Sequence, residues 1–446
     1  MPKLRFPHPL TLLVACVLAA AALSHVLPAG RYERRDDPAT GRSVVVPGTY
    51  QRVEPTPLGA FQTLVAIPKG MGDAAAVIFY VFLVGGAFAV VEQTGALRRV
   101  VDWLLRKHAR HETLVIPAAS VAFALGGVLI QMQEELIAFV PVLLLLCRRS
   151  GFDALTAVAI SLGAAAVGAA FSPINPFQVQ IAQKVSELPV GSGATFRLAA
   201  LLPALALWIW GTMRYAARTR RPPEAADLTD SGPIGWRRAA VLWVVLATFV
   251  VFVLGVKAGW EFEQLAALFF LMGVLAGLVG GLRVAGTADA FVEGFRSMAL
   301  AALLIGFARG IYVAMNEGQI VDTIVNGLFA PLAHLPVTIS ALGMMAVQTA
   351  VHFPVPSTSG QAVLTLPVLV PLSDLLGLSR QVTVLAYQYG AGLCELLTPT
   401  NGALMAMLAA TNVSYDRWIR FLTPLYAALA GLAALSMVIG VAVGLR

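Results

Sequence analysis

Long apolar runs, separated by short polar or basic stretches, make up most of the chain. Seven of them are continuous and close in length to the ~20 residues with which an α-helix crosses the hydrocarbon core of a bilayer. They are Leu10–Leu27, Ala74–Val91, Leu198–Met213, Ala239–Val256, Gln264–Leu282, Met298–Met315 and Phe421–Leu445. Two more apolar stretches, residues 154–184 and 381–411, are interrupted by proline-centred polar segments. The pattern predicts an all-α polytopic membrane protein with about nine transmembrane helices, two of them broken.

Two other apolar pairs, residues 113–147 and 337–373, have a second arm of about a dozen residues after a polar tip. Such an arm covers about 18 Å as a helix, which is too short for a hydrocarbon core of about 30 Å. We therefore expect two re-entrant hairpins, each of which enters and leaves the membrane on one side.

Composition and charge agree with a membrane protein. Hydrophobic residues make up 58% of the 446 residues and charged residues 12%, whereas soluble domains carry about 25% charged residues. This excludes a soluble enzyme, a disulfide scaffold and a disordered regulator. The net charge of +7 comes from basic residues at the edges of apolar runs, which is the pattern that orients membrane helices and is not typical of nucleic-acid binding.

The charge distribution places the N-terminus in the cytoplasm and the C-terminus outside. Lys3 and Arg5 precede the first apolar run, which continues past Cys16, so we expect an uncleaved first helix rather than a signal peptide. Residues 28–73 form a single long loop on the outer side in this topology. The expected location is a cytoplasmic (inner) membrane of the bacterial type.

An internal repeat organises the chain. A shift of 226 residues aligns Pro141 with Pro367, Gly151 with Gly377, Pro173 with Pro399 and Asn175 with Asn401. In the predicted topology the two copies have opposite orientations, and such inverted repeats are typical of secondary transporters. The predicted units are residues 1–213 (first repeat), 214–262 (cytoplasmic linker and connecting helix) and 263–446 (second repeat).

The polar residues of both repeats gather at a hairpin tip and at a helix break. Proline unwinds a helix, and at mid-membrane depth the freed carbonyls and amides can bind an ion or a substrate. The neutral candidates are Gln133 at the first tip, Ser172 and Asn175 at the first break, Ser357, Thr358, Ser359, Gly360 and Gln361 at the second tip, and Thr398, Thr400 and Asn401 at the second break. The alternative is a pair of structural proline kinks, but the repetition of both kinks beside polar tips favours a binding site.

Four charged residues add to this site. Glu134 and Glu135 lie at the first tip and Glu395 lies three residues before Thr398, so we expect them to bind a coupling proton, a sodium ion or a cationic substrate group. The alternative for the glutamate pair is solvation at the membrane interface. Arg309, inside an apolar run, either pairs with one of the glutamates or binds a substrate carboxylate. His352 and His334 are better interpreted as structural histidines than as metal ligands.

At these motifs the sequence resembles the C4-dicarboxylate anaerobic carrier family, especially its YfcC-like branch, within the ion transporter superfamily. The matching segments are Met132–Glu135, Asn175–Gln183, Ala308–Ile311, Gly318–Ile324, Pro356–Ala362 and Val46–Tyr50. The superfamily includes sodium–carboxylate symporters and p-aminobenzoyl-glutamate exporters. The resemblance implies a dimeric elevator whose transport domain, with both hairpins and both broken helices, slides against a scaffold. Two departures are the acidic Glu134–Glu135 in place of a Ser-Asn-Thr motif and Asn401 in place of the serine of a Pro-Thr-Ser-Gly motif.

The sequence therefore predicts a cation-coupled secondary transporter or exchanger of a small, carboxylate-bearing charged metabolite that works by alternating access. A C4-dicarboxylate and an amino acid both remain open as substrates, and a basic amino acid antiporter of the arginine/ornithine type is the alternative. A passive channel, a sensor and an intramembrane enzyme are weaker rivals, and no nucleotide-binding loop or catalytic motif is present. We expect no cofactor beyond H⁺ or Na⁺ as the coupling ion, with Na⁺ at the two breaks. The expected partners are the substrate, the lipid bilayer and a second copy of the chain.

Overall fold

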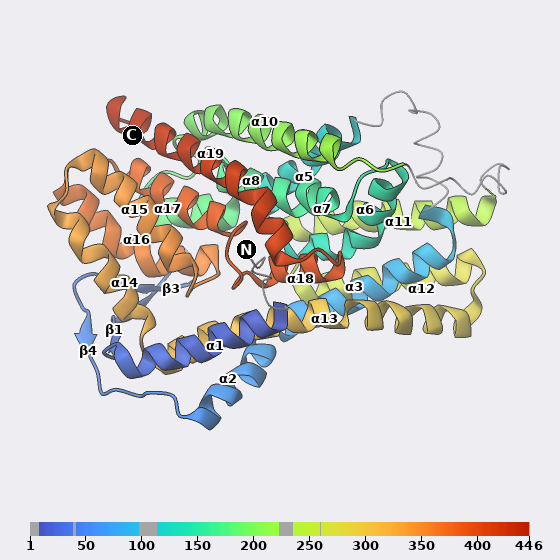
Figure 1. Cartoon of the computed structure of the whole chain (residues 1–446), viewed down its shortest axis with the longest axis horizontal. Coiled ribbons are helices and arrows are strands. Elements are labelled where there is room, and N and C mark those ends of the chain that lie inside the picture. Colours follow the sequence, from blue (N-terminus) through green and yellow to red (C-terminus); the bar gives the residue numbers. More distant parts are fainter. Residues whose placement is uncertain (1–8, 39–41, 98–113, 223–234, 259, 446) are drawn as a thin grey trace, which may run out of the picture.

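The computed structural model of the chain describes residues 9–38, 42–97, 114–222, 235–258 and 260–445. Lys3 and Arg5, the first residue of the predicted 113–147 hairpin and the polar stretch 223–234 of the predicted linker lie outside these residues. The described chain is helical over most of its length (Figure 1).

The seven continuous apolar runs all form helices, as predicted. They are α1 Pro9–Val26, α3 Ala75–Gln93, α10 Ala194–Arg218, α11 Trp236–Lys257, α12 Phe262–Gly280, α13 Arg283–Glu317 and α19 Tyr415–Ala442. By length and composition, α3, α10, α12, α13 and α19 can each cross a membrane. Helix α13 begins at Arg283, well before its apolar run, and its first turns carry exposed charged side chains such as Glu293 and Arg296.

Both predicted hairpins and both predicted helix breaks are present. The first hairpin comprises α5 Val115–Ile130, the 3₁₀ turn η2 Glu134–Phe139 and α6 Val140–Arg149, and the second comprises α15 Val337–His352 and α16 Thr358–Leu375. The first broken helix contains α7 Ala154–Val158, the π-helical η3 Ala159–Gly163 and α8 Ala164–Ala170 before its break, then η4 Pro176–Gln180 and α9 Ile181–Val185. The second contains α17 Arg380–Cys394 and α18 Gly402–Ala410. In Figure 1 the two hairpins lie toward opposite ends of the long axis, as expected for an inverted repeat.

The segment between α1 and α3 is more ordered than the single loop that the sequence suggested. It contains two antiparallel strand pairs, β1 Gly30–Arg31 with β4 Gln51–Arg52 and β2 Arg34–Asp37 with β3 Arg42–Val45, followed by α2 Ala60–Asp73. Helix α2 escaped detection because only three of its residues, at helical spacing, are buried, while large side chains such as Phe61 stay exposed. Two further short elements are α14 Val321–Phe329 and the 3₁₀ turn η5 Ala330–His334.

Asp322 of α14 holds this segment in place. Its carboxylate accepts a hydrogen bond from the Tyr32 amide at 2.9 Å and forms an ion pair with Arg34 at 2.8 Å. The Tyr32 hydroxyl also donates to Asn326 at 3.1 Å. Burial, reinforced by the nearby Asp322 carboxylate, raises the pKa of Tyr32 to about 12.

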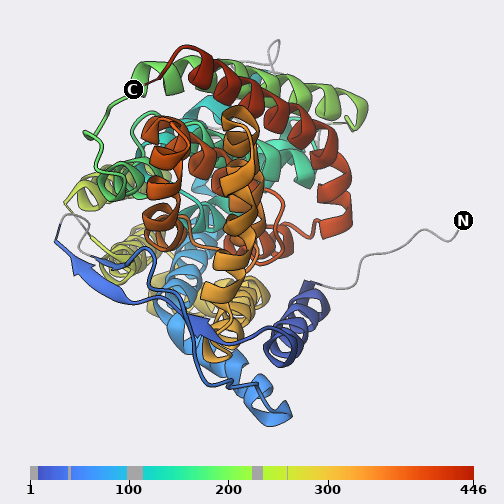
Figure 2. The same cartoon turned by 90° about the vertical axis from the view of Figure 1, so that its left-hand side faces the viewer.

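The helices form two groups that meet at the centre of the molecule. Helices α3, α11, α12 and α13 share one apolar core, in which the rings of Phe88, Phe249 and Phe269 pack together with Phe139 of η2. The hairpins, the broken helices, α10 and α19 share another core with α1 and the C-terminal part of α13. Figures 1 and 2 show α10 and α19 along one edge and α1 and α2 along the opposite edge.

In each repeat the first arm of the hairpin packs closely on the first part of the broken helix. Helix α5 meets α8 at Gly168, where an added Cβ would lie 2.2 Å from the Ala124 carbonyl oxygen. Helix α15 meets α17 at Gly390, where an added Cβ would lie 2.5 Å from the Met345 carbonyl oxygen. Small residues let membrane helices approach closely, and here they bring each tip beside a helix break.

The substitution Gly168→Ala tests this contact. A methyl group at this position must push α8 away from the α5 backbone, and we expect a destabilisation of about 1–3 kcal/mol. The matched control is Gly431→Ala in α19, where an added Cβ meets no atom within 4 Å. A lower apparent melting temperature of detergent-purified Gly168→Ala, with Gly431→Ala unchanged, is the predicted result. Equal melting temperatures for both variants would contradict the close packing.

Candidate substrate site

The second helix break exposes polar groups to a cavity. Helix α17 ends at Cys394 and α18 begins at Gly402, where the Asn401 side chain caps the new helix by accepting a hydrogen bond from the Leu404 amide at 3.2 Å. Pro399 lies within the intervening segment and supplies no amide donor, so the helix cannot continue through it. The cap leaves the amide nitrogen of Asn401 free to bind other groups.

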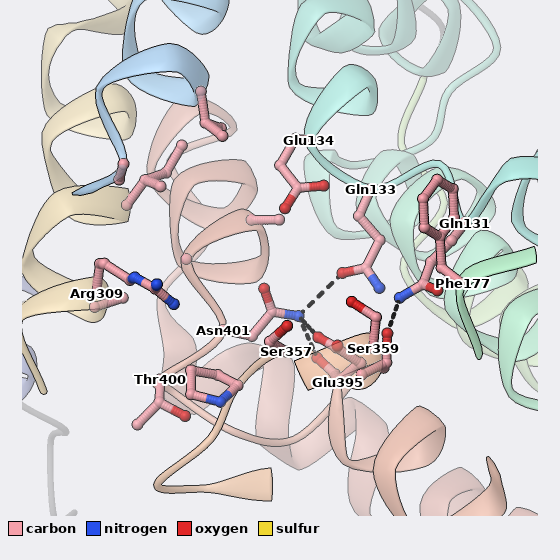
Figure 3. A pocket seen from close by; sticks show the side chains of 18 of the residues that line it. Gln131, Gln133, Glu134, Phe177, Arg309, Ser357, Ser359, Glu395, Thr400 and Asn401 are labelled. Carbon is pink, nitrogen blue, oxygen red and sulfur yellow. Dashed lines mark hydrogen bonds between the residues drawn. The ribbon is translucent and has the colours of Figure 1, made fainter. Parts of the chain in front are cut away.

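This cavity has a volume of about 430 Å³, within the range of small-molecule sites. Both hairpin tips and the second break contribute to it, together with residues of α2, α13 and η4. Ten of the fifteen candidate residues line it: Gln133, Glu134, Glu135, Arg309, Ser357, Thr358, Ser359, Glu395, Thr400 and Asn401. The structure therefore brings together two tips that lie more than 200 residues apart in the sequence (Figure 3).

Asn401 connects the first tip with the second break. Its side-chain nitrogen donates to Gln133 Oε1 at 3.2 Å, to the Glu395 carbonyl at 3.1 Å and to Glu395 Oε2. Figure 3 shows Asn401 between these two residues. A second hydrogen bond, from Gln131 Nε2 to Thr358 Oγ1 at 2.6 Å, joins the two tips directly.

The polar side chains of the first break form hydrogen bonds with the protein backbone instead of facing the cavity. Ser172 donates to the Val128 carbonyl at 2.9 Å and accepts from the amides of Ile174 and Asn175. Asn175 donates to the Gly127 carbonyl at 2.8 Å and caps η4 by accepting from the amides of Phe177 and Gln178. Ser172 and Asn175 thus position the first tip against its break and do not line the cavity.

Three more candidate residues lie outside the cavity lining. Thr398 is fully buried and bonds to Thr400 at 2.7 Å, so it supports a lining residue. Gly360 belongs to the second tip, and its backbone amide donates to Ser357 Oγ at 3.3 Å in the cap of α16. Gln361 is buried behind the tip in a network with Gln348 and His352.

Arg309 does not pair with Glu134, Glu135 or Glu395. Its Nε lies 3.5 Å from Asp73 Oδ2 at the end of α2, and its guanidinium stacks over the Tyr312 ring at 4.8 Å. The sequence could not reveal this partner because α2 was taken for a loop. Helices α2 and α13 cross closely enough to bring Asp73 and Arg309 together. At the crossing, a Cβ added at Gly70 of α2 would lie 2.3 Å from the Gly310 amide nitrogen of α13.

Two buried residues near the site, Arg197 and His352, were not among the candidate site residues predicted from the sequence. Arg197 of α10 is fully buried and donates to Gln388 at 2.9 Å and Gln381 at 3.0 Å, while Gln388 donates to the Ser172 carbonyl at 2.8 Å. His352 is fully buried, and its Nε2 lies 3.2 Å from Glu395 Oε1. An arginine within an amphipathic run carries no sequence signal of burial, whereas His352 was noted from the sequence and interpreted as a structural histidine.

The charges of the lining favour a cationic ligand group. Glu134 and Glu135 are half-buried and Glu395 is 6% exposed, so all three face the cavity rather than bulk water. Among the residues that the structure describes, Arg309 is the basic residue in the lining, and Asp73 neutralises it. An excess of buried carboxylates in a water-accessible cavity requires protons or a bound cation.

A membrane protein whose two hairpin tips meet a broken helix at a polar central cavity has the architecture of a carrier. The family model described as "DcuC: C4-dicarboxylate anaerobic carrier" matches residues 6–443. The chain belongs to this family, and it is a multi-pass membrane transporter rather than an enzyme.

Two relatives place it within the family. The chain is 34% identical over 374 residues to the Escherichia coli K12 protein named "Putative basic amino acid antiporter YfcC", with 78% of this chain and 74% of that protein covered. It is 28% identical over 494 residues to a Haemophilus influenzae protein without a functional name, and the match covers 98% of this chain and 97% of that protein.

Two solved transporter structures are more distantly similar. The YdaH transporter of Alcanivorax borkumensis is 19% identical with a TM-score of 0.44, and the match covers 97% of this chain and 98% of that one. Neisseria gonorrhoeae MtrF is 18% identical with a TM-score of 0.43, with 98% and 95% covered.

The substitution Asn401→Ala tests the centre of the site. It removes the α18 cap and leaves the Glu395 carboxylate and the Gln133 carbonyl without their shared donor, so we expect a destabilisation of about 1–3 kcal/mol. Asn316→Ala, at an exposed position of α13, is the matched control. Thermal unfolding in detergent measures both, and an Asn401→Ala variant as stable as Asn316→Ala would show that this hydrogen-bond centre is dispensable.

Proposed function

We propose that the protein exchanges an amino acid with a cationic side chain across the membrane, in an alternating-access cycle coupled to a second cation. The observation that carries this proposal is the charge of the central cavity, where Glu134, Glu135 and Glu395 face a single arginine already paired with Asp73. A dicarboxylate would meet repulsion in this lining. The name of the relative, "Putative basic amino acid antiporter YfcC", supports the same substrate class.

The two ends of such a substrate have different partners in the lining. Its ammonium or guanidinium group would bind the glutamates, which supply charge-assisted hydrogen bonds. Its α-carboxylate would bind at the second tip, where Ser357, Thr358 and Ser359 begin the 18-residue helix α16. The N-terminus of a helix carries partial positive charge and free amides, and the nearby Arg309 adds to it.

The two tips would also serve as the gates of the cycle. The hydrogen bond between Gln131 and Thr358 joins them beside the cavity, so movement of one tip away from the other requires that this bond break. The distribution of basic residues supports an inner-membrane orientation with the N-terminus in the cytoplasm and the C-terminus outside. A dimeric elevator, in which α3, α11, α12 and α13 belong to the scaffold, follows from the resemblance and stays part of the proposal, as does Na⁺ at either break.

Counterflow in proteoliposomes tests the function. Liposomes loaded with unlabelled arginine, ornithine, succinate or leucine are diluted into labelled substrate, with sodium and proton gradients varied separately. We expect saturable counterflow of arginine or ornithine and none of succinate. Glu134→Gln and Glu135→Gln should each lower the apparent affinity about tenfold or more, because each removes a charged partner of the cation.

Glu54→Gln is the matched control, because Glu54 is exposed in the segment before α2. Counterflow of succinate without arginine would replace the proposed substrate class by a dicarboxylate. Ion currents without any counterflow would show a channel and refute the carrier cycle itself.

A further inference from the structure

His352 lies behind the wall of the cavity and faces Glu395, which lines it. His352 closes the first arm of the second hairpin, and its ring is fully buried, while Glu395 lines the cavity from the second break. The His352 Nε2 atom lies 3.2 Å from Glu395 Oε1 and makes no well-directed hydrogen bond with any residue that the structure describes. A buried ring nitrogen normally has a hydrogen-bond partner, and it can pair with a carboxylate only if one of the two groups carries a proton.

The neighbouring amides determine which nitrogen of His352 carries a fixed proton. Gln361 Nε2 donates to the Gln348 carbonyl at 2.7 Å, so its Oε1 is the atom that faces His352 Nδ1 at 2.7 Å. Gln348 is oriented in turn, because its own Nε2 donates to Thr365 at 2.8 Å. Since Gln361 Oε1 can only accept, Nδ1 is the nitrogen that donates in this arrangement.

The Glu395 carboxylate is oriented in the same way. Asn401 uses its oxygen to cap α18, so its nitrogen donates to Glu395 Oε2. Glu395 Oε1 is left facing His352 Nε2. A neutral His352 with its proton on Nδ1 and an ionised Glu395 would place two acceptors at 3.2 Å, so the arrangement is stabilised when one of the two groups takes up a proton.

We propose that His352 Nε2 and Glu395 Oε1 together bind the coupling proton, and that this proton and the cationic group of the substrate compete for Glu395. The proposal rests on the proposed function and identifies its second cation as H⁺. With the shared proton the pair is electrically neutral. When the proton leaves through the cavity to water, Glu395 carries one negative charge on the cavity side, and the substrate cation restores neutrality.

The position of each group suits this role. His352 is sealed from the cavity and can hold only a proton, whereas Glu395 reaches both the histidine and the cavity. The other charged groups of the same lining are Glu134 and Glu135 on η2, Asp73 on α2 and Arg309 on α13. On the buried side Cys394 precedes Glu395, and Tyr415 and Tyr426 of α19 lie near that thiol. The experiment below separates the pair from these groups by variants at the pair itself.

Proton release on arginine binding tests the competition directly. Purified protein in weakly buffered detergent solution is titrated with arginine while a pH-sensitive dye reports released protons. Wild-type protein should release about one proton per bound arginine at acidic pH, and its apparent affinity should rise about tenfold per pH unit. Glu395→Gln should abolish both effects.

The substitution His352→Gln tests whether His352 binds the proton or only fills its position in the structure. Glutamine can still fill the position and form hydrogen bonds, but it has no basic nitrogen. We expect the dependence of arginine affinity on pH to change, because the proton loses one of its two partners. His25→Gln is the control, since the His25 ring contacts the Leu58 carbonyl and does not line the cavity, so this variant should leave the profile unchanged. An unchanged profile in His352→Gln would overturn the proposal.

A second measurement distinguishes failure of this proposal from failure of the proposed function. Nitrogen-15 NMR of histidine-labelled protein without substrate, assigned by comparison with His352→Gln, reports each ring nitrogen. The proposal predicts a protonated Nδ1 at all accessible pH values and an Nε2 signal that changes with pH and is altered in Glu395→Gln. If arginine does not bind but this signal appears, the substrate class is wrong and the proton site stands. If arginine exchanges without proton release, or if Nε2 is the permanently protonated nitrogen, the proton site is wrong and the exchanger stands.

Discussion

The requirement that unwound backbone inside a membrane protein must find hydrogen-bond partners determines much of this structure. Pro173 and Pro399 each stop a buried helix, and an asparagine two residues later starts the next one by capping it. A hairpin tip lies beside each break and supplies further partners. Asn175 binds the backbone of the first hairpin through the Gly127 carbonyl, and Asn401 binds the Gln133 side chain of that same hairpin. The first hairpin is therefore held by both repeats.

The two breaks share a pattern but differ in their use of polar atoms. At the first break the side chains of Ser172 and Asn175 form hydrogen bonds with the protein backbone, and the neutral Gln388 joins the Ser172 carbonyl to the buried Arg197. At the second break Thr400, Asn401 and Glu395 reach the cavity. A fixed arginine near one break and a titratable carboxylate beside the other give the repeats different electrostatic environments. We infer that the second break is the one at which ligands exchange.

The sequence predicted the framework well because its signals are strong and local. Apolar run lengths identified the seven continuous helices, and prolines located both breaks. Polar tips located the hairpins, but a second arm of about a dozen residues was wrong for the second hairpin, whose α16 has 18 residues. The same reasoning selected Gln133, the glutamates and Asn401, because polar residues inside apolar helices are costly without a role. The sequence paired each tip with the break of its own repeat, and the contact between the two tips emerged only from the structure.

Other features depend on tertiary packing that a single sequence does not encode locally. Helix α2 buries only a narrow stripe, so neither it nor the Asp73 partner of Arg309 was expected. Ser172 and Asn175 have the same composition as ligand-binding residues, and only their neighbours show that they are bound to backbone. His352 looked like a structural histidine, and its significance comes from Gln361 and Glu395 on other elements. The domain boundaries, elevator motion and dimer stay predictions.

The central claim is that the acid-lined cavity between the two tips and the second break binds a cationic amino acid. A cryo-electron microscopy map of the protein with arginine, compared with a map obtained with succinate, tests it most directly. The account predicts density for arginine between Glu395, Asn401 and the start of α16, and an empty cavity with succinate. Density for succinate at Arg309 in this cavity, with none for arginine, would contradict the account.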